Sequence, residues 1–156
     1  MKKLILASMA LALVACKGGD DAETDTTAAI EPATPALTPA QSMYAGTWNG
    51  RSYRLNAPAS DTGSAWTMTF TPAGPDLTGT LRFSGQTTDI PIRVESATES
   101  GMRTAFGPYT SPTVGSAEVN TTTDGRVEGD SLVGSFVATP TGGGDRVSGR
   151  FTARRQ

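Results

Sequence analysis

Few residues of this 156-residue chain could carry out catalysis or hold a metal. The chain has no histidine and a single cysteine, Cys16. Without histidine there is no base for a Ser–His–Asp or Cys–His arrangement, and a structural zinc site of thiolate and imidazole ligands cannot be completed. One cysteine also cannot form a disulfide within the chain. We therefore expect no metal and no cofactor.

Carboxylates are the remaining candidates for catalysis. Asp124, Glu128 and Asp130 lie close together in the sequence, and paired acids can serve as the acid and the base or nucleophile of a glycosidase. Asp124 and Asp130 each adjoin a glycine, a context in which an acid usually solvates a bend. Their spacing is not that of a calcium loop, and the glycines at 142–144 lack the Lys-Ser/Thr of a phosphate loop. We therefore predict no catalytic residues and no enzymatic activity.

The residue whose setting does indicate chemistry is Cys16. Lys2 and Lys3 give the chain a positive start, and residues 4–14 form an almost wholly apolar run. This run is shorter than the roughly 20 residues that cross a bilayer as a helix. A positive start followed by a short apolar core indicates an export signal.

Leu13-Val14-Ala15-Cys16 resembles the lipobox of bacterial lipoproteins. The resemblance implies cleavage between Ala15 and Cys16, attachment of a diacylglycerol to the Cys16 thiol and acylation of the new amino group. Two or more fatty chains hold a protein stably on a membrane, whereas one does so only marginally. The alternative is an ordinary secretory signal, in which Cys16 is incidental.

The segment after Cys16 is rich in Gly, Ala, Thr, Pro and acids. It has too few apolar residues to offset the entropy of ordering, which predicts disorder. We divide the chain into a signal peptide (1–15), a lipidated cysteine with its linker (16–42) and a folded domain (43–156). Lipoproteins with aspartate after the cysteine tend to stay in the inner membrane. Lys17 at this place implies, by the same resemblance, an outer-membrane lipoprotein facing the periplasm, with the cell surface as the alternative.

The folded domain has an all-β composition. Its ten arginines balance ten acids, so we expect no field that attracts nucleic acid or an anionic surface. Short runs of alternating apolar and polar residues separated by turn signals predict strands. The eight expected strands are 44–54, 65–71, 77–84, 88–95, 101–106, 114–122, 131–138 and 147–154. Asp124-Gly125 is expected to form a two-residue hairpin turn.

Four strands share a pattern in which a large residue, a glycine and a second large residue fall on one face. The four segments are Tyr44-Gly46-Trp48, Leu77-Gly79-Leu81, Leu132-Gly134-Phe136 and Val147-Gly149-Phe151. Glycine weakens a strand unless the missing side chain is needed, and a sheet that curls until it closes has that need where inner side chains crowd. The pattern favours a single antiparallel up-and-down β-barrel. Eight strands enclose an interior that side chains fill or that holds one small ligand.

The same alternation predicts which residues face inward and which face water. The expected core is Trp48, Trp66, Met68, Phe70, Leu77, Leu81, Phe83, Ile90, Ile92, Val94, Val119, Leu132, Phe136, Val147 and Phe151. The expected outer residues are Thr67, Thr69, Thr78, Thr80, Arg82, Arg93, Ser135, Arg150 and Thr152.

Gly46-Thr47-Trp48 at the start of the domain and Arg154-Arg155 at its end resemble the calycin arrangement of avidins and lipocalins. In these families a first-strand tryptophan lies against an arginine from the end of the chain. The resemblance implies a structural cap of Trp48 with Arg154 or Arg155 on the barrel floor, and a binding role is the alternative. Biotin sites of avidins use several tryptophans. This domain has only Trp66 besides Trp48, so we expect no biotin binding.

Two functions remain open from the sequence, besides a purely structural role in the envelope. The first is a non-enzymatic binding module for a small ligand or an envelope partner, with a pocket near Tyr53, Trp66 and Tyr109. The second is an envelope inhibitor of a protease or lysozyme, with residues 108–112 as a stiff projecting loop. An open cavity lined by Trp66 would favour the first function, and a filled interior with a projecting loop would favour the second.

Overall fold

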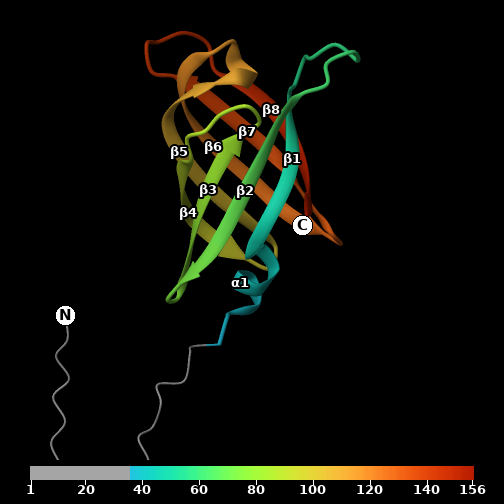
Figure 1. Cartoon of the computed structure of the whole chain (residues 1–156), viewed down its shortest axis with the longest axis vertical. Coiled ribbons are helices and arrows are strands. Elements are labelled where there is room, and N and C mark those ends of the chain that lie inside the picture. The colour runs from blue at the N-terminus through green and yellow to red at the C-terminus, as the bar shows by residue number, and fades with distance from the viewer. Residues whose placement is uncertain (1–35) are drawn as a thin grey trace, which may run out of the picture. The chain divides into compact units, whose positions relative to one another are not determined.

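A computed structural model describes residues 36–156. The signal peptide, Cys16 and most of the linker expected from the sequence lie outside these residues. Eight antiparallel strands pair in sequence order and close into one barrel, with β8 against β1 (Figure 1). The strands are β1 (Gly46–Arg54), β2 (Ser64–Ala73), β3 (Asp76–Phe83), β4 (Ile90–Thr98), β5 (Gly101–Ser111), β6 (Ala117–Glu128), β7 (Ser131–Pro140) and β8 (Val147–Arg155). The predicted all-β barrel of eight strands is confirmed. Within the described part, no helix has the length and apolar character needed to cross a membrane.

The interior is filled by one face of each strand. β3 alternates strictly between exposed and buried residues, as expected for a strand with one face in the core. The predicted inward residues are buried except Val94 and Val147, which are partly exposed. Val94 adjoins a register shift in the β4–β5 pair, and Val147 begins β8. All the predicted outer residues are partly or fully exposed.

Glycines on the inner face allow aromatic rings to lie against the backbone of the neighbouring strand. Four glycines are directly opposite an aromatic residue: Gly50 opposite Trp66, Gly79 opposite Phe70, Gly134 opposite Phe151 and Gly149 opposite Phe136. A Cβ atom would lie 2.4 Å from the ring at Gly50 and 2.2 Å from the ring at Gly149, which is too close for any side chain. Gly46 is different, because it has φ +115° and no ring against it.

One turn is placed differently from the sequence prediction. Asp124 and Gly125 lie inside β6, where Gly125 pairs with Met102 on one side and Gly134 on the other. The chain turns instead at Gly129 and the residue after it, between β6 and β7. Gly129 has φ +58°, which glycine adopts readily. The Asp-Gly pair was therefore a wrong turn signal, because two neighbouring strands hydrogen-bond along that stretch.

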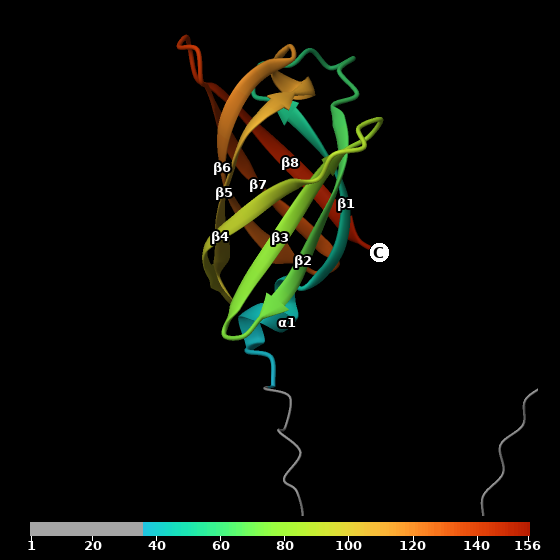
Figure 2. The ribbon, with the colours of Figure 1, turned by 60° about the vertical axis from the view of Figure 1, so that its left-hand side comes forward.

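A short helix closes one end of the barrel. Helix α1 (Pro39–Tyr44) begins with a capping box between Thr38 and Gln41. The Gln41 side chain is buried and donates to the carbonyl oxygens of Gly74 (3.0 Å) and Asp76 (2.9 Å) at the β2–β3 turn. Both ribbon views place α1 beneath this end of the barrel (Figures 1 and 2). Ordered structure therefore begins before residue 43, within the segment that the sequence assigned to the linker.

Candidate functional site

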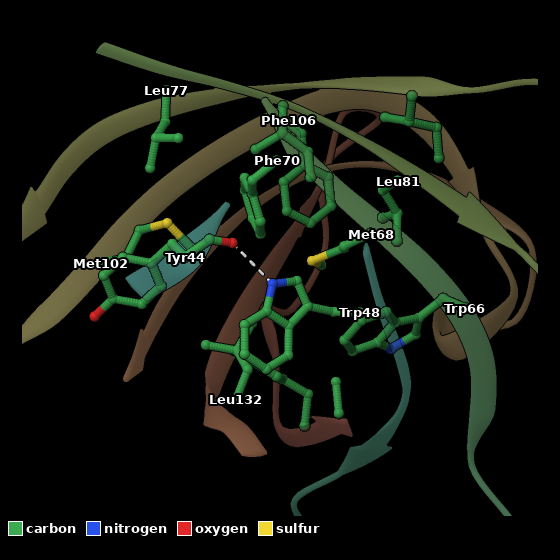
Figure 3. Packing of buried hydrophobic residues seen from close by; sticks show 14 of the residues in the cluster. Tyr44, Trp48, Trp66, Met68, Phe70, Leu77, Leu81, Met102, Phe106 and Leu132 are labelled. Atoms are coloured by element: carbon green, nitrogen blue, oxygen red, sulfur yellow. Dashed lines mark hydrogen bonds between the residues drawn. The ribbon is translucent and has the colours of Figure 1, made fainter. Parts of the chain in front are cut away.

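The barrel floor is built around Trp48. This side chain is fully buried, and its Nε1 donates to the carbonyl oxygen of Tyr44 at 2.8 Å (Figure 3). The Arg155 guanidinium lies 4.5 Å from the centre of the Trp48 ring and donates to the backbone carbonyls of Met43 and Ala45. Both arginines are exposed, but Arg155 has the inward register of the buried Phe151 and Ala153, and Arg154 has the outward register of Thr152. Arg155 therefore lies over Trp48, and Arg154 does not.

The Tyr44 side chain completes this floor. It is fully buried beside Trp48, with Met102 and Leu132 nearby (Figure 3). Its hydroxyl is the one buried side-chain polar atom within residues 36–156 that has no hydrogen-bond partner. Desolvation raises the pKa of Tyr44. An aromatic plug of this kind blocks access to the interior from the α1 end.

A small cavity lies inside the barrel toward the opposite end. Its volume is about 30 Å³, which is room for about two water molecules. Its lining comes from the ends of strands away from α1, and from η1 (Pro112–Val114), a 3-10 helix between β5 and β6. The lining residues are Ser52, Trp66, Met68, Leu81, Phe83, Phe106, Tyr109, Ser111, Thr113, Thr121, Thr123, Phe136 and Phe151.

Much of the cavity lining is aromatic. Trp66 meets Phe151 edge to face with ring centres 6.0 Å apart. Tyr109 stacks on Phe83 at 5.7 Å and lies 5.5 Å from Phe106. Such pairs add stabilisation beyond the area that they bury. These rings are held in place by one another and present flat apolar surfaces to the cavity.

Hydroxyl groups lie between the aromatic residues of the lining. The Tyr109 hydroxyl lies 3.0 Å from the Thr121 hydroxyl, and the Ser52 hydroxyl lies 3.1 Å from that of Thr113. Each hydroxyl has one donor and two acceptor positions, so these pairs keep spare acceptor capacity. Burial raises the pKa of Tyr109, against the lowering effect of hydrogen bonds from Thr121 and Ser111. The Tyr109 hydroxyl is therefore protonated at neutral pH.

The three residues predicted to form a pocket are only partly brought together. Trp66 and Tyr109 both line the cavity. Tyr53 does not, because it follows the inward-facing Ser52 on β1 and faces outward, opposite Arg150 of β8. The hydroxyl groups of the cavity lining were missed by the sequence analysis. Alternation along Val119, Thr121 and Thr123 could have revealed it, since these residues share one face of β6.

The hypothesis of an envelope inhibitor required a projecting loop at residues 108–112, but most of this segment is part of a strand. Residues 108–111 belong to β5, and Tyr109 packs into the interior. Phe106 and Tyr109 are an odd number of residues apart, which would place them on opposite faces of a regular strand. A register shift against β6 lies between them, with Phe106 opposite Thr121 and Tyr109 opposite Val119. This irregularity turns both rings inward.

The acids considered for glycosidase chemistry lie away from the cavity. Asp124 is exposed and lies 3.5 Å from Arg103. Glu128 accepts from Arg126 at 2.7 Å on the outer surface. Asp130 is exposed in the β6–β7 turn. Within residues 36–156 no three acids lie together in a group that could hold a metal ion.

No family model, no curated protein and no solved structure matches this chain. The aromatic rings and hydroxyl groups of the cavity lining suit the binding of a small molecule, and none of the described lining residues is charged.

Proposed function

We propose that the barrel is a non-enzymatic binding module that takes a small, uncharged, amphipathic ligand into its interior cavity. The observation that carries the proposal is the composition of the lining, in which aromatic rings and hydroxyl groups surround one cavity without a charged group. As part of the same proposal, lipid on Cys16 holds the module in the cell envelope, on the periplasmic face of the outer membrane.

The lining restricts the chemistry of the ligand. A charged group buried without a partner costs far more than it gains, and none of the lining residues is charged. A flat apolar part fits against Trp66 and Phe83, where ring stacking is available. A single hydroxyl or amide group fits where Tyr109 and Thr121 can exchange hydrogen bonds with it.

The size of the cavity sets a further condition. A cavity of about 30 Å³ is smaller than the pockets that bind drug-sized ligands. Met68 is the most adaptable lining residue, since its unbranched thioether chain changes shape easily. At the same end, η1 is tied to β1 through the hydroxyls of Thr113 and Ser52. Entry of a ligand larger than water therefore requires movement of Met68 and opening of this hydroxyl contact.

The cavity is tested by titrating residues 17–156 with phenol, toluene and benzoate, followed through the fluorescence of the two tryptophans and ligand-observed NMR. Phenol is expected to bind best, toluene more weakly and benzoate not at all. Thr121→Val should reduce the preference for phenol over toluene by about 3- to 10-fold, the value of one net hydrogen bond. Thr122→Val, on the outer face of the same strand, is the matched control. Equal binding of the three compounds, or equal effects of the two variants, would contradict the proposal.

The anchor is tested separately by mass spectrometry of the mature protein from its native membrane and by fractionation of the envelope. We expect a Cys16 N-terminus that carries fatty chains, in the outer-membrane fraction. A mature protein with an unmodified Cys16 thiol would remove the anchor from the proposal and leave the cavity assay unaffected.

A further inference from the structure

Charge is unevenly distributed around the barrel, although the domain as a whole is balanced. The neighbouring strands β7, β8, β1 and β2 form half of the closed sheet and contain no aspartate or glutamate. Their arginines are Arg51, Arg54, Arg150, Arg154 and Arg155. The carboxylates within strands are Asp76, Glu95, Glu118, Asp124 and Glu128, all on β3, β4 and β6. The equal numbers of arginines and acids in the domain therefore do not show how the charges are distributed between the two halves of the barrel.

Ion pairing follows the same division. Every ion pair within residues 36–156 involves an arginine of the other half of the barrel, namely Arg82, Arg93, Arg103 or Arg126. Arg155 is engaged with Trp48. Arg51 donates to the backbone carbonyls of Thr62 and Gly63, which leaves its positive charge uncompensated. The basic half is thus not neutralised by carboxylates of the described chain.

These cations lie along two adjacent strands. We define the β1–β8 seam as Arg51, Arg54, Arg150 and Arg154, together with Arg146 just before β8. Arg154 is opposite Asn49 and Arg54 is opposite Gly149, so the seam extends about 17 Å along the strands. Arg54 has the inward register of the buried Gly149, and its exposed side chain therefore lies at the rim of the barrel, at the end of the seam. Arg54 and Arg146 line one surface hollow with Leu55. The acids closest in sequence, Asp61, Asp130 and Asp145, lie in the connections at its margins.

The seam also exposes apolar surface. Leu55, directly after Arg54, is 66% exposed and is one of two exposed large hydrophobic residues within residues 36–156. Tyr53 is on the outer face opposite Arg150. Proteins are held at a membrane surface by a combination of three features: a tyrosine at the level of the lipid headgroups, an inserted apolar side chain and arginines beside them. Long arginine side chains reach phosphates while their stems cover apolar surface.

We propose that the β1–β8 seam docks the domain onto an anionic lipid bilayer, with Leu55 inserted among the headgroups and the arginines on lipid phosphates. The exposed Leu55 and the half-buried Tyr53 beside it favour lipid over an anionic glycan or peptide. The choice of lipid also rests on the proposed anchor, which would keep the domain within reach of a bilayer. Each basic residue near an anionic membrane surface contributes about 1 kcal/mol, so the seam can hold the domain even though the chain has a net charge of −2.

The test uses residues 17–156 without lipid, in sedimentation with vesicles of phosphatidylcholine alone or mixed with phosphatidylglycerol. We expect binding only to the mixed vesicles, weakening as salt is added. Two triple variants lose the same charge: R54Q/R146Q/R150Q in the seam and R82Q/R93Q/R126Q on the other half. The seam variant should bind on the order of 100-fold more weakly, and the other variant within a few-fold of the parent. Equal binding by both variants, or binding that does not depend on phosphatidylglycerol, would overturn the proposal.

A further variant separates lipid from another polyanion. Leu55→Ser should weaken binding to the mixed vesicles and leave any binding to alginate, a soluble anionic glycan, unchanged. Parent-like vesicle binding by Leu55→Ser, or capture by alginate without capture by vesicles, would rule out lipid as the partner. The chain in this assay carries no lipid, so a failure to bind vesicles would not contradict the Cys16 anchor. A bare Cys16 would remove one of the two reasons for choosing lipid but would not change the vesicle binding expected here.

Discussion

The contact between glycines and aromatic rings inside the barrel leads to a prediction for Gly149→Ala. The added Cβ would lie 2.2 Å from Cε1 of Phe136 and 2.2 Å from the carbonyl oxygen of Tyr53. The ring can tilt, but the carbonyl belongs to the neighbouring strand and cannot move without distorting the ladder between β1 and β8. Overpacking of a core costs about 1–3 kcal/mol, occasionally more. We expect Gly149→Ala to lie at the upper end, near 3 kcal/mol.

Two other glycines calibrate this value. At Gly79 the added Cβ would lie 2.8 Å from the Phe70 ring and 3.3 Å from Cβ of Ile92, with no backbone atom among the closest neighbours. Because side chains can give way, Gly79→Ala should cost about 1 kcal/mol. At Gly142 a Cβ meets nothing within 4 Å. Gly142→Ala should therefore leave stability unchanged or raise it by up to about 1 kcal/mol, since alanine restricts the unfolded chain.

Urea and thermal denaturation of the three variants, followed by near-ultraviolet circular dichroism, measure these differences. At about 4 °C per kcal/mol for a domain of this size, Gly149→Ala should lower the Tm by about 12 °C and Gly79→Ala by about 4 °C. Shortening the ring with Phe70→Leu should remove most of the cost at Gly79, which a double-mutant cycle would detect as coupling. A Gly149→Ala protein as stable as Gly142→Ala would refute close ring-to-backbone packing as the reason for these glycines.

Three further predictions concern the floor and the cavity. Arg155→Ala should lower the free energy of unfolding by about 2 kcal/mol in urea titrations, because it removes charged hydrogen bonds to two carbonyls and the contact with Trp48. The matched change Arg154→Ala should lower it by less than about 0.5 kcal/mol. Equal losses in the two variants would contradict the role of Arg155 as a cap on Trp48. Gln41→Ala should cost about 2 kcal/mol by the same assay, since the bonds that the side chain donates to Gly74 and Asp76 are lost together with the one that it accepts from the Thr38 backbone N–H. A neutral result would mean that α1 is not docked. The raised pKa of Tyr109 means that the native state keeps its proton where the unfolded chain has released it, so stability should fall as the pH rises above about 10. Tyr109→Phe should fall less steeply over that range, and identical slopes would contradict the burial of this hydroxyl.

Much of the fold could be predicted because the period of two along a strand is a local property of the sequence. Trp66, Met68 and Phe70 alternate with threonines, and this alone identifies their shared inner face. The strand content and the closed barrel follow from such runs and from the glycines within them. The helix at Pro39–Tyr44 was missed because six residues show no convincing apolar period, yet Thr38 and Gln41 form a capping box that marks a helix start.

The candidate site was less predictable because it depends on irregularities and on register. Tyr109 reached the cavity through a shift in the β5–β6 pairing, which no local pattern announces. Tyr53 was placed in the pocket by its chemistry, whereas its position next to the buried Ser52 puts it outside. An aromatic residue type therefore does not show whether its ring faces the barrel interior or the solvent.

The amino-acid sequence by itself determined the strand pattern, the absence of histidine and the net charge. The tertiary structure alone decided that Arg155 rather than Arg154 covers Trp48, that hydroxyls from β1, η1, β5 and β6 share one cavity, and that the first and last strands bring their arginines together. The physical reason is that the face on which a side chain lies follows from local alternation along its strand. The pairing of β1 with β8, in contrast, joins residues from the two ends of the domain. Charges that cancel in composition are thereby separated in space.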